Sequence, residues 1–265
     1  MQVLGLCRFS YPGLGGYQVE HDSVSAREAH LYDPKRMELR FALFQSITLP
    51  SIRAQVDQDF VFAIVIGDSL PSEYKQRLLA MCKDVPSVQI IEKPAGDHRT
   101  TMREVMQELR DSNSALTVQF RLDDDDAVAC TFVQRVKEDA ERFLPCLEND
   151  NKFALDYCSG LALSPKGSAK IRRPYWTPAL AVAMDPTCEK SILDFPHQRM
   201  YQMMPTVTQN APLCFVRAFH DDNDSTQNSG MPNLSYAPLD QRTTSILANR
   251  FGITAQAAMQ ALTMT

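Results

Sequence analysis

The sequence predicts an α/β fold built on a mainly parallel sheet flanked by helices, and three observations lead to this prediction. Short apolar segments alternate with amphipathic segments through the first half of the chain. Residues 60–66 are apolar without interruption, as expected of a strand buried on both faces of a parallel sheet. Several of these apolar segments end in Gly, Pro or Asp, which interrupt strands and form loops. Such alternation is typical of parallel strands joined by covering helices.

The first half of the chain divides into regular elements. The expected strands are residues 2–9, 60–66, 88–92 and 115–120, and the expected helices are residues 33–49, 72–82, 98–109 and 131–143. In the first of these helices the apolar residues Met37, Phe41 and Phe44 recur at spacings of four and three, which places them on one face. Pro50 is then expected to open a second short helical turn at residues 51–55.

The second half is less regular. We expect a strand pair or one long strand at residues 153–163, where Gly160 lets another part of the chain approach closely. A proline-rich segment follows, and it contains Trp176 beside Tyr175. Further expected elements are a short strand at 192–195, a helical turn at 197–204, a strand at 213–219, a helix from 239 to 247 or beyond, and helical structure at 254–264. With no internal repeat, residues 1–265 are expected to form a single domain.

Composition excludes several classes of function. The net charge of -5 and the pI of about 5.6 argue against a nucleic-acid or anionic-membrane surface. A small basic cluster can contact an anionic ligand or form a solvated loop; it comprises Lys166, Lys170, Arg172 and Arg173.

Cysteine usage and the N-terminus bear on location. The seven cysteines include no Cys-x-x-Cys pair, which favours reduced thiols of a cytosolic protein over a zinc site or a disulfide framework. Residues 1–13 lack a basic leader segment, and no segment approaches the length of a membrane span. We therefore expect a soluble, cytoplasmic protein, with peripheral membrane contact left open.

The most informative stretch runs from Gln119 to Ala127, because it begins as a strand and ends in four consecutive aspartates, 123–126. Ligands bind at the carboxyl ends of strands in open α/β sheets. Neighbouring carboxylates about 6 Å apart repel each other by roughly 3 kcal/mol per pair at an effective dielectric constant of about 20. A divalent cation such as Mg²⁺ or Mn²⁺ removes that repulsion and can also bridge a diphosphate. The alternative is an acidic surface turn.

The loop after the first strand is a second candidate. Arg8 is followed closely by Pro12, Gly13, Gly15 and Gly16, and such a loop commonly lines the ligand crevice of an α/β sheet. Arg8 can therefore hold a phosphate or a base edge, or it can form a structural ion pair.

These segments resemble a known enzyme family. Residues 44–55, followed by Asp59-Phe60 and a strand ending in Gly67-Asp68, resemble the opening of family 2 glycosyltransferases. Residues 122–126 are similar to the Asp-x-Asp motif of the GT-A fold, a Rossmann-like, mixed and mainly parallel α/β architecture. Nearly the whole chain resembles a bacterial family described as rhamnosyltransferases, through residues 8–12, 119–127, 195–197 and 220–225.

The resemblance implies a nucleotide-diphospho-sugar donor and a divalent metal, Mn²⁺ or Mg²⁺. It implies that Asp123 faces the ribose or sugar, that Asp125 takes the metal, and that Asp126 supports the site. Asp68 is expected near the nucleotide base. The implied donor-binding residues are Arg8, Asp68, Arg103, Arg121, Asp123 and Asp124, and the implied metal ligands are Asp123, Asp125 and His220. Residues 1–127 would then form the nucleotide-sugar half and residues 128–265 the acceptor half.

The resemblance leaves the catalytic base unassigned, because the chain lacks a clear Glu-Asp pair of the kind usual in family 2. Asp194 and His197 fall near its expected position, and either side chain could take the acceptor hydroxyl proton. A helix cap is the alternative role for Asp194, and a histidine satisfied within its own polar loop is the alternative for His220.

Other side chains have two roles open to them. Arg99 and Arg103 can approach the diphosphate or form surface ion pairs with Glu104 or Asp111. Trp176 and Tyr175 can stack on an acceptor sugar or belong to the core.

The sequence therefore predicts a metal-dependent, inverting glycosyltransferase that moves a sugar, rhamnose by the family name, from a nucleotide sugar to a glycan or other hydroxyl acceptor. A sugar nucleotidyltransferase is one alternative, although its glycine-rich loop is usually basic and the loop here, Gly13 to Gly16, has no Lys or Arg. A non-catalytic Ca²⁺- or carbohydrate-binding module is another, although the aspartate spacing does not match an EF-hand loop. The sugar, base, acceptor and oligomeric state stay open.

Overall fold

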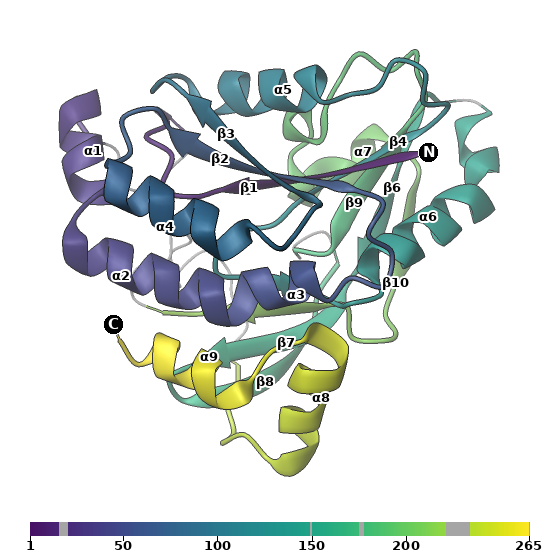
Figure 1. Ribbon diagram of the computed structural model, residues 1–265. Coiled ribbons are helices and arrows are strands. Elements are labelled where there is room, and N and C mark those ends of the chain that lie inside the picture. The colour runs from purple at the N-terminus through teal and green to yellow at the C-terminus, as the bar shows by residue number, and fades with distance from the viewer. Residues whose placement is uncertain (16–20, 149, 175–177, 221–233, 265) are drawn as a thin grey trace.

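A computed structural model describes residues 1–265 except 16–20, 149, 175–177, 221–233 and 265. Its centre is a seven-stranded sheet with strand order β10-β6-β9-β4-β1-β2-β3 (Figure 1). The strands are β1 (Gln2–Arg8), β2 (Val61–Gly67), β3 (Val88–Lys93), β4 (Thr117–Arg121), β6 (Lys152–Tyr157), β9 (Leu180–Met184) and β10 (Thr206–Gln209). β9 runs antiparallel to β4 and β6, whereas the other neighbours are parallel. The predicted fold class, a mixed and mainly parallel sheet flanked by helices, is confirmed.

Helices cover both faces of this sheet (Figure 1). The helices of the described part of the chain are α1 (Val24–Leu31), α2 (Pro34–Leu43), α3 (Leu49–Arg53), α4 (Ser72–Cys82), α5 (His98–Glu108), α6 (Phe132–Arg142), α7 (Met200–Met203), α8 (Gln241–Phe251) and α9 (Ala255–Leu262). Side chains alternate along the strands, so that Val3 and Cys7 of β1 enter one apolar core while Leu4 and Leu6 enter the other. The first core also contains α2 and α4 residues, and the second contains α5 and α7 residues.

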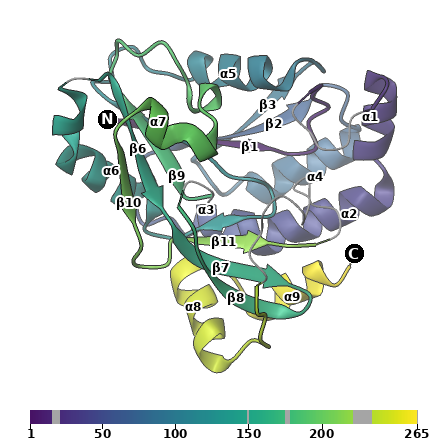
Figure 2. The same cartoon turned by 180° about the vertical axis from the view of Figure 1, so that it is seen from behind.

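A second sheet, of order β5-β11-β7-β8, lies next to α3 and α9 (Figure 2). Its strands are β5 (Ala127–Val128), β7 (Ser159–Ser164), β8 (Gly167–Arg172) and β11 (Phe215–Ala218). β5 follows the aspartates directly and pairs antiparallel with β11, with Ala127 opposite Val216. This pairing brings the end of β11 to the acidic turn, although the two segments are far apart in the sequence.

Gly160 is confirmed as a point of close approach. It pairs with Phe215 of β11, and a Cβ at position 160 would lie 2.4 Å from the Phe215 carbonyl oxygen. We expect Gly160→Ala to destabilise the protein by about 1–3 kcal/mol, because overpacking a strand pair forces the backbone to move. Urea unfolding measures this. Gly96→Ala is the matched control, since its nearest contact would be 3.4 Å. Equal stability of the two variants would contradict the prediction.

Several predicted elements were wrong in detail. Residues 153–163 belong to two strands of different sheets, β6 and β7, and the proline-rich segment contains β8 and β9. Residues 192–195 do not form a strand, because Ile192–Asp194 is a 3₁₀-helix (η3) capped by Ser191. Pro50 does open a short helix, α3, as predicted, but a π-helical segment, Phe44–Thr48 (η1), joins α2 to α3 without a break, and a first-turn proline is tolerated there.

Some elements were not predicted, and two further observations concern the cysteines and membrane-spanning helices. Helix α1 and strand β10 were not expected from the sequence. All seven cysteines are free thiols. Within the described part of the chain, no helix has the length and apolar character needed to cross a bilayer.

Candidate active site

The four aspartates form a tight turn between β4 and β5, at the carboxyl end of the main sheet. Leu122 N–H donates to Leu6 O at 2.9 Å, which holds the turn on β1, and Asp126 N–H donates to Asp123 O at 3.2 Å. Asp124, Asp125 and Asp126 are buried, whereas the Asp123 side chain is 53 % exposed. The predicted location at a strand end is therefore correct, and most of the turn is not a solvated surface loop.

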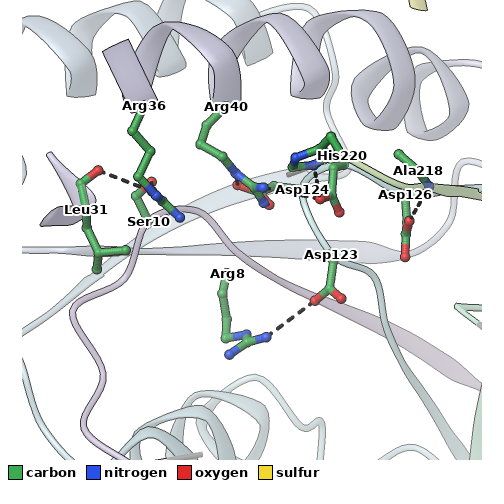
Figure 3. A network of polar contacts seen from close by, with 11 residues as sticks. Arg8, Ser10, Leu31, Arg36, Arg40, Asp123, Asp124, Asp126, Ala218 and His220 are labelled. Carbon is green, nitrogen blue, oxygen red and sulfur yellow. Dashed lines mark hydrogen bonds and ion pairs between the residues drawn. The ribbon is translucent and has the colours of Figure 1, made fainter. Parts of the chain in front are cut away.

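Two of the carboxylates are held by a buried arginine of α2. Arg40 forms an ion pair with Asp124, in which Nε donates to Oδ2 at 3.1 Å, and its Nη1 donates to Asp125 Oδ2 at 3.2 Å. His220 Nε2 lies 2.9 Å from the same Asp125 oxygen. Figure 3 shows Arg40 and His220 approaching the turn together. The predicted metal ligand His220 thus directs this nitrogen at Asp125.

The other two carboxylates have separate partners (Figure 3). Arg8 of β1 donates from Nη2 to Asp123 Oδ1 at a long 3.4 Å. The Ala218 backbone N–H, at the end of β11, donates to Asp126 Oδ1 at 3.0 Å. Each aspartate is therefore fixed by a segment remote in the sequence.

These contacts separate the acidities of neighbouring carboxyls. Burial alone would raise the pKa of Asp125, but the Arg40 charge and the His220 hydrogen bond outweigh it and hold that pKa below its usual range. Burial and the Asp125 charge raise the pKa of Asp126 well above its usual value. A cation beside both carboxylates would offset their mutual repulsion and favour the charged form of Asp126, which would lower its pKa.

The turn fits a hard divalent cation. Asp123, Asp125 and Asp126 each offer one carboxylate oxygen, and the three oxygens lie within 4.8 Å of one another. Oxygen-only donors suit Mg²⁺ or Mn²⁺. Asp124 is outside this group and forms an ion pair with Arg40.

A pocket of about 240 Å³ opens beside the turn. It is lined by Arg8, Arg121 of β4 and Arg217 of β11, together with Asp123 and Asp126. Strand ends from both sheets therefore supply cationic side chains to one cavity that also exposes metal-ligating carboxylates.

Two histidines complete the wall of this pocket. Burial and the Arg8 and Arg121 charges lower the pKa of His98 to about 3. Burial and the Arg121 and Arg217 charges lower the pKa of His197 well below its usual value. Both imidazoles are therefore neutral at neutral pH. Since a guanidinium only donates, His98 Nε2 accepts from Arg8 Nη1 at 3.0 Å.

Some predicted site residues lie elsewhere. Asp194 is in η3, where its Oδ2 accepts from the Ser191 backbone N–H at 2.8 Å and its Oδ1 faces Arg103 Nη1 at 3.4 Å. Its expected place at a strand end is wrong, and its carboxylate serves as a helix cap because the chain turns into a 3₁₀-helix there. Neither Asp194 nor Arg103 is among the described residues that line the pocket. Asp68 is exposed and lies just beyond the end of β2.

Other predictions fall outside the described residues, namely those for Tyr175, Trp176 and residues 221–225. Conversely, sequence reasoning missed Arg40 and Arg217. A signal for Arg40 was present: it lies three residues after Met37 and four before Phe44, within the apolar stripe of its helix. An arginine in a buried stripe needs a buried acidic partner.

A carboxylate turn and a cationic pocket at the ends of parallel strands are suited to a glycosyltransferase that uses nucleotide sugars. The family model described as "Putative rhamnosyl transferase" matches residues 2–232, so the chain belongs to this family of glycosyltransferases. No curated protein sequence matches the chain.

Similar solved structures are distant. S. aureus TarS 1–349 in complex with UDP-GlcNAc has 8% sequence identity and a TM-score of 0.48, over 84% of this chain and 60% of that chain. A putative nucleotide-diphospho-sugar transferase from Desulfovibrio desulfuricans G20 has 13% identity and a TM-score of 0.43, over 99% of both chains. The present chain thus spans about 60% of the length of the TarS fragment.

Proposed function

We propose that the protein transfers a sugar from a nucleotide-diphospho-sugar to a hydroxyl of a glycan or other acceptor. The observation that supports this most is the group of three carboxylate oxygens within 4.8 Å of one another, beside a cationic pocket at the strand ends. Asp123, Asp125 and Asp126 would hold Mn²⁺ or Mg²⁺. Rhamnose is the sugar suggested by the family description.

The bound cation would neutralise charge on the leaving diphosphate. In this proposal residues 1–127 bind the donor and residues 128–265 bind the acceptor. Arg8 lies on the donor side, where His98 accepts its Nη1–H at 3.0 Å and thereby fixes the direction of the guanidinium. Asp68, beyond the end of β2, is proposed to contact the nucleotide base.

Inversion at the anomeric carbon requires a base for the acceptor proton. His197 suits this role better than Asp194, because it is a neutral imidazole that lines the pocket, whereas the Asp194 carboxylate caps η3. Burial and the Arg121 and Arg217 charges lower the pKa of His197 and make it a weak base, and a substrate that offsets those charges would strengthen it.

A thermal-shift screen of nucleoside diphosphates and nucleotide sugars, with and without Mn²⁺, tests the donor class. A ligand that binds only the folded state at 100 times its Kd stabilises the protein by about 2.7 kcal/mol. For a chain of this size that corresponds to a rise in Tm of roughly 5–10 °C. We expect one base to give a shift that depends on Mn²⁺.

Two results would contradict the proposal. One is a screen in which no nucleotide sugar raises Tm in the presence of Mn²⁺. The other is release of pyrophosphate from a nucleoside triphosphate and a sugar phosphate, which would make the protein a nucleotidyltransferase.

A further inference from the structure

Two polar side chains of the pocket have nitrogen atoms that the protein itself does not satisfy. Arg121 Nε and His197 Nε2 are both inaccessible to solvent, and neither has a hydrogen-bond partner among the described residues. Both side chains line the same cavity, one from β4 and the other from the 3₁₀-helix His197–Arg199 (η4). A buried polar group without a partner is costly, so an unsatisfied guanidinium N–H and an unsatisfied imidazole nitrogen, on two side chains that line one cavity, indicate a ligand with both acceptor and donor groups.

The charge of the pocket favours an anion. Asp123, the acid whose charge acts on Arg121, is already contacted by Arg8 at 3.4 Å. Asp126 accepts from Ala218 and belongs to the carboxylate group that fits a cation. Arg121 and Arg217 both line the cavity, so a bound anion would offset two positive charges there.

We propose that the acceptor substrate has an acidic group, a phosphate or a carboxylate, and that Arg121 and Arg217 bind it beside His197. This inference rests on the proposed function. A guanidinium matches two oxygens of a carboxylate or phosphate, which gives orientation as well as affinity. The acidic group would anchor the acceptor so that a neighbouring hydroxyl meets His197 Nε2.

The origin of Arg217 and His197 supports the acceptor over the donor, although Arg121 lies in the donor half and the sequence placed it among the donor-binding candidates. Arg217 and His197 come from β11 and η4, within the half of the chain proposed to bind the acceptor. The donor side is already supplied with Arg8 and the three carboxylates. An anion on Arg121 and Arg217 would also offset the charges that weaken His197 as a base.

Inorganic phosphate is the probe for this subsite. Its binding is measured by calorimetry to the full chain, alone and with saturating Mn²⁺ and the nucleoside diphosphate that gives the largest thermal shift. We expect phosphate to bind in both conditions. Arg121→Gln should weaken phosphate binding by about 10- to 100-fold, the effect of losing one charge-assisted contact. The affinity for the nucleoside diphosphate should change by no more than about 2-fold.

Lys83→Gln is the control, because it removes one positive charge from an exposed position at the end of α4. If circular dichroism shows that Arg121→Gln does not fold, Arg121→Lys replaces it, because lysine keeps the charge but cannot contact two oxygens with a planar guanidinium. We expect Arg121→Lys to weaken phosphate binding by about 5-fold or more. The inference would be overturned if phosphate competed with the nucleoside diphosphate or did not bind the wild type. It would also be overturned if the Arg121 variants bound phosphate as tightly as the wild type. Failure of the proposed function is distinguishable, since it would appear as no nucleotide binding with Mn²⁺.

Discussion

Asp125→Asn is expected to lower kcat/KM for sugar transfer by about 1,000-fold without unfolding the protein. The change removes one anionic ligand from the group of three carboxylates, and a metal ion contributes several kcal/mol of charge stabilisation. A loss of about 4 kcal/mol corresponds to this factor at 1.36 kcal/mol per tenfold. The amide keeps the size of the side chain, and its oxygen can still accept from Arg40 and His220.

Initial rates, Mn²⁺ calorimetry and circular dichroism test this expectation together. Asp59→Asn provides the control, because that side chain is 90% exposed and is paired with Lys137, which is not part of the acidic turn. A variant with unchanged Mn²⁺ affinity and unchanged rate would show that Asp125 is not a metal ligand and that the proposed site is wrong.

Arg40→Met is expected to destabilise the fold by about 3–5 kcal/mol, because it leaves Asp124 buried without its ionic partner. The side chains of Arg40 and Asp124 are only 9% and 3% exposed. Arg53→Met is the matched control: Arg53 and Asp84 are 45% and 59% exposed, so losing their ion pair should cost about 0–1 kcal/mol. Urea unfolding in the presence of EDTA measures both.

Two dependences distinguish this effect from simple loss of packing. Mn²⁺ should stabilise Arg40→Met more than it stabilises the wild type, because the ion replaces a missing positive charge. Arg40 also helps to hold the pKa of Asp125 below its unfolded value. That contribution is present above about pH 4 and is lost as the pH falls through the folded pKa, so the difference between the proteins should shrink in acid. If the difference in free energy of unfolding between wild type and Arg40→Met changed with neither Mn²⁺ nor pH, Arg40 would stabilise the protein through packing alone.

Local patterns predicted the first half of the fold well, because its strands and helices have clear apolar periods. They failed where tertiary context decides. The apolar run around Gly160 does not show that the chain changes sheets between β6 and β7. Likewise, the short apolar segment before Asp194 forms a 3₁₀-helix, because Ser191 Oγ accepts from the Leu193 N–H at 3.2 Å and Asp194 Oδ2 accepts from the Ser191 N–H at 2.8 Å.

The same limit applies to the site. The aspartates could be placed from their position after a strand, but their partners could not, because Arg40 lies 84 residues from Asp124 and His220 lies 95 residues from Asp125. Nothing in local spacing connects such residues. The arginine within an apolar stripe was the available clue, and it indicated burial without naming the partner.

The short pairing of β5 with β11 has an evolutionary consequence. The pairing joins the acidic turn to a strand much later in the chain, and the Ala218 N–H donates to Asp126, 92 residues before it. If the proposed donor and acceptor halves meet at residue 127, they therefore could not be inherited as separate modules cut at that point. Recombination between relatives would preserve a working centre only when the turn, β5 and β11 come from the same parent.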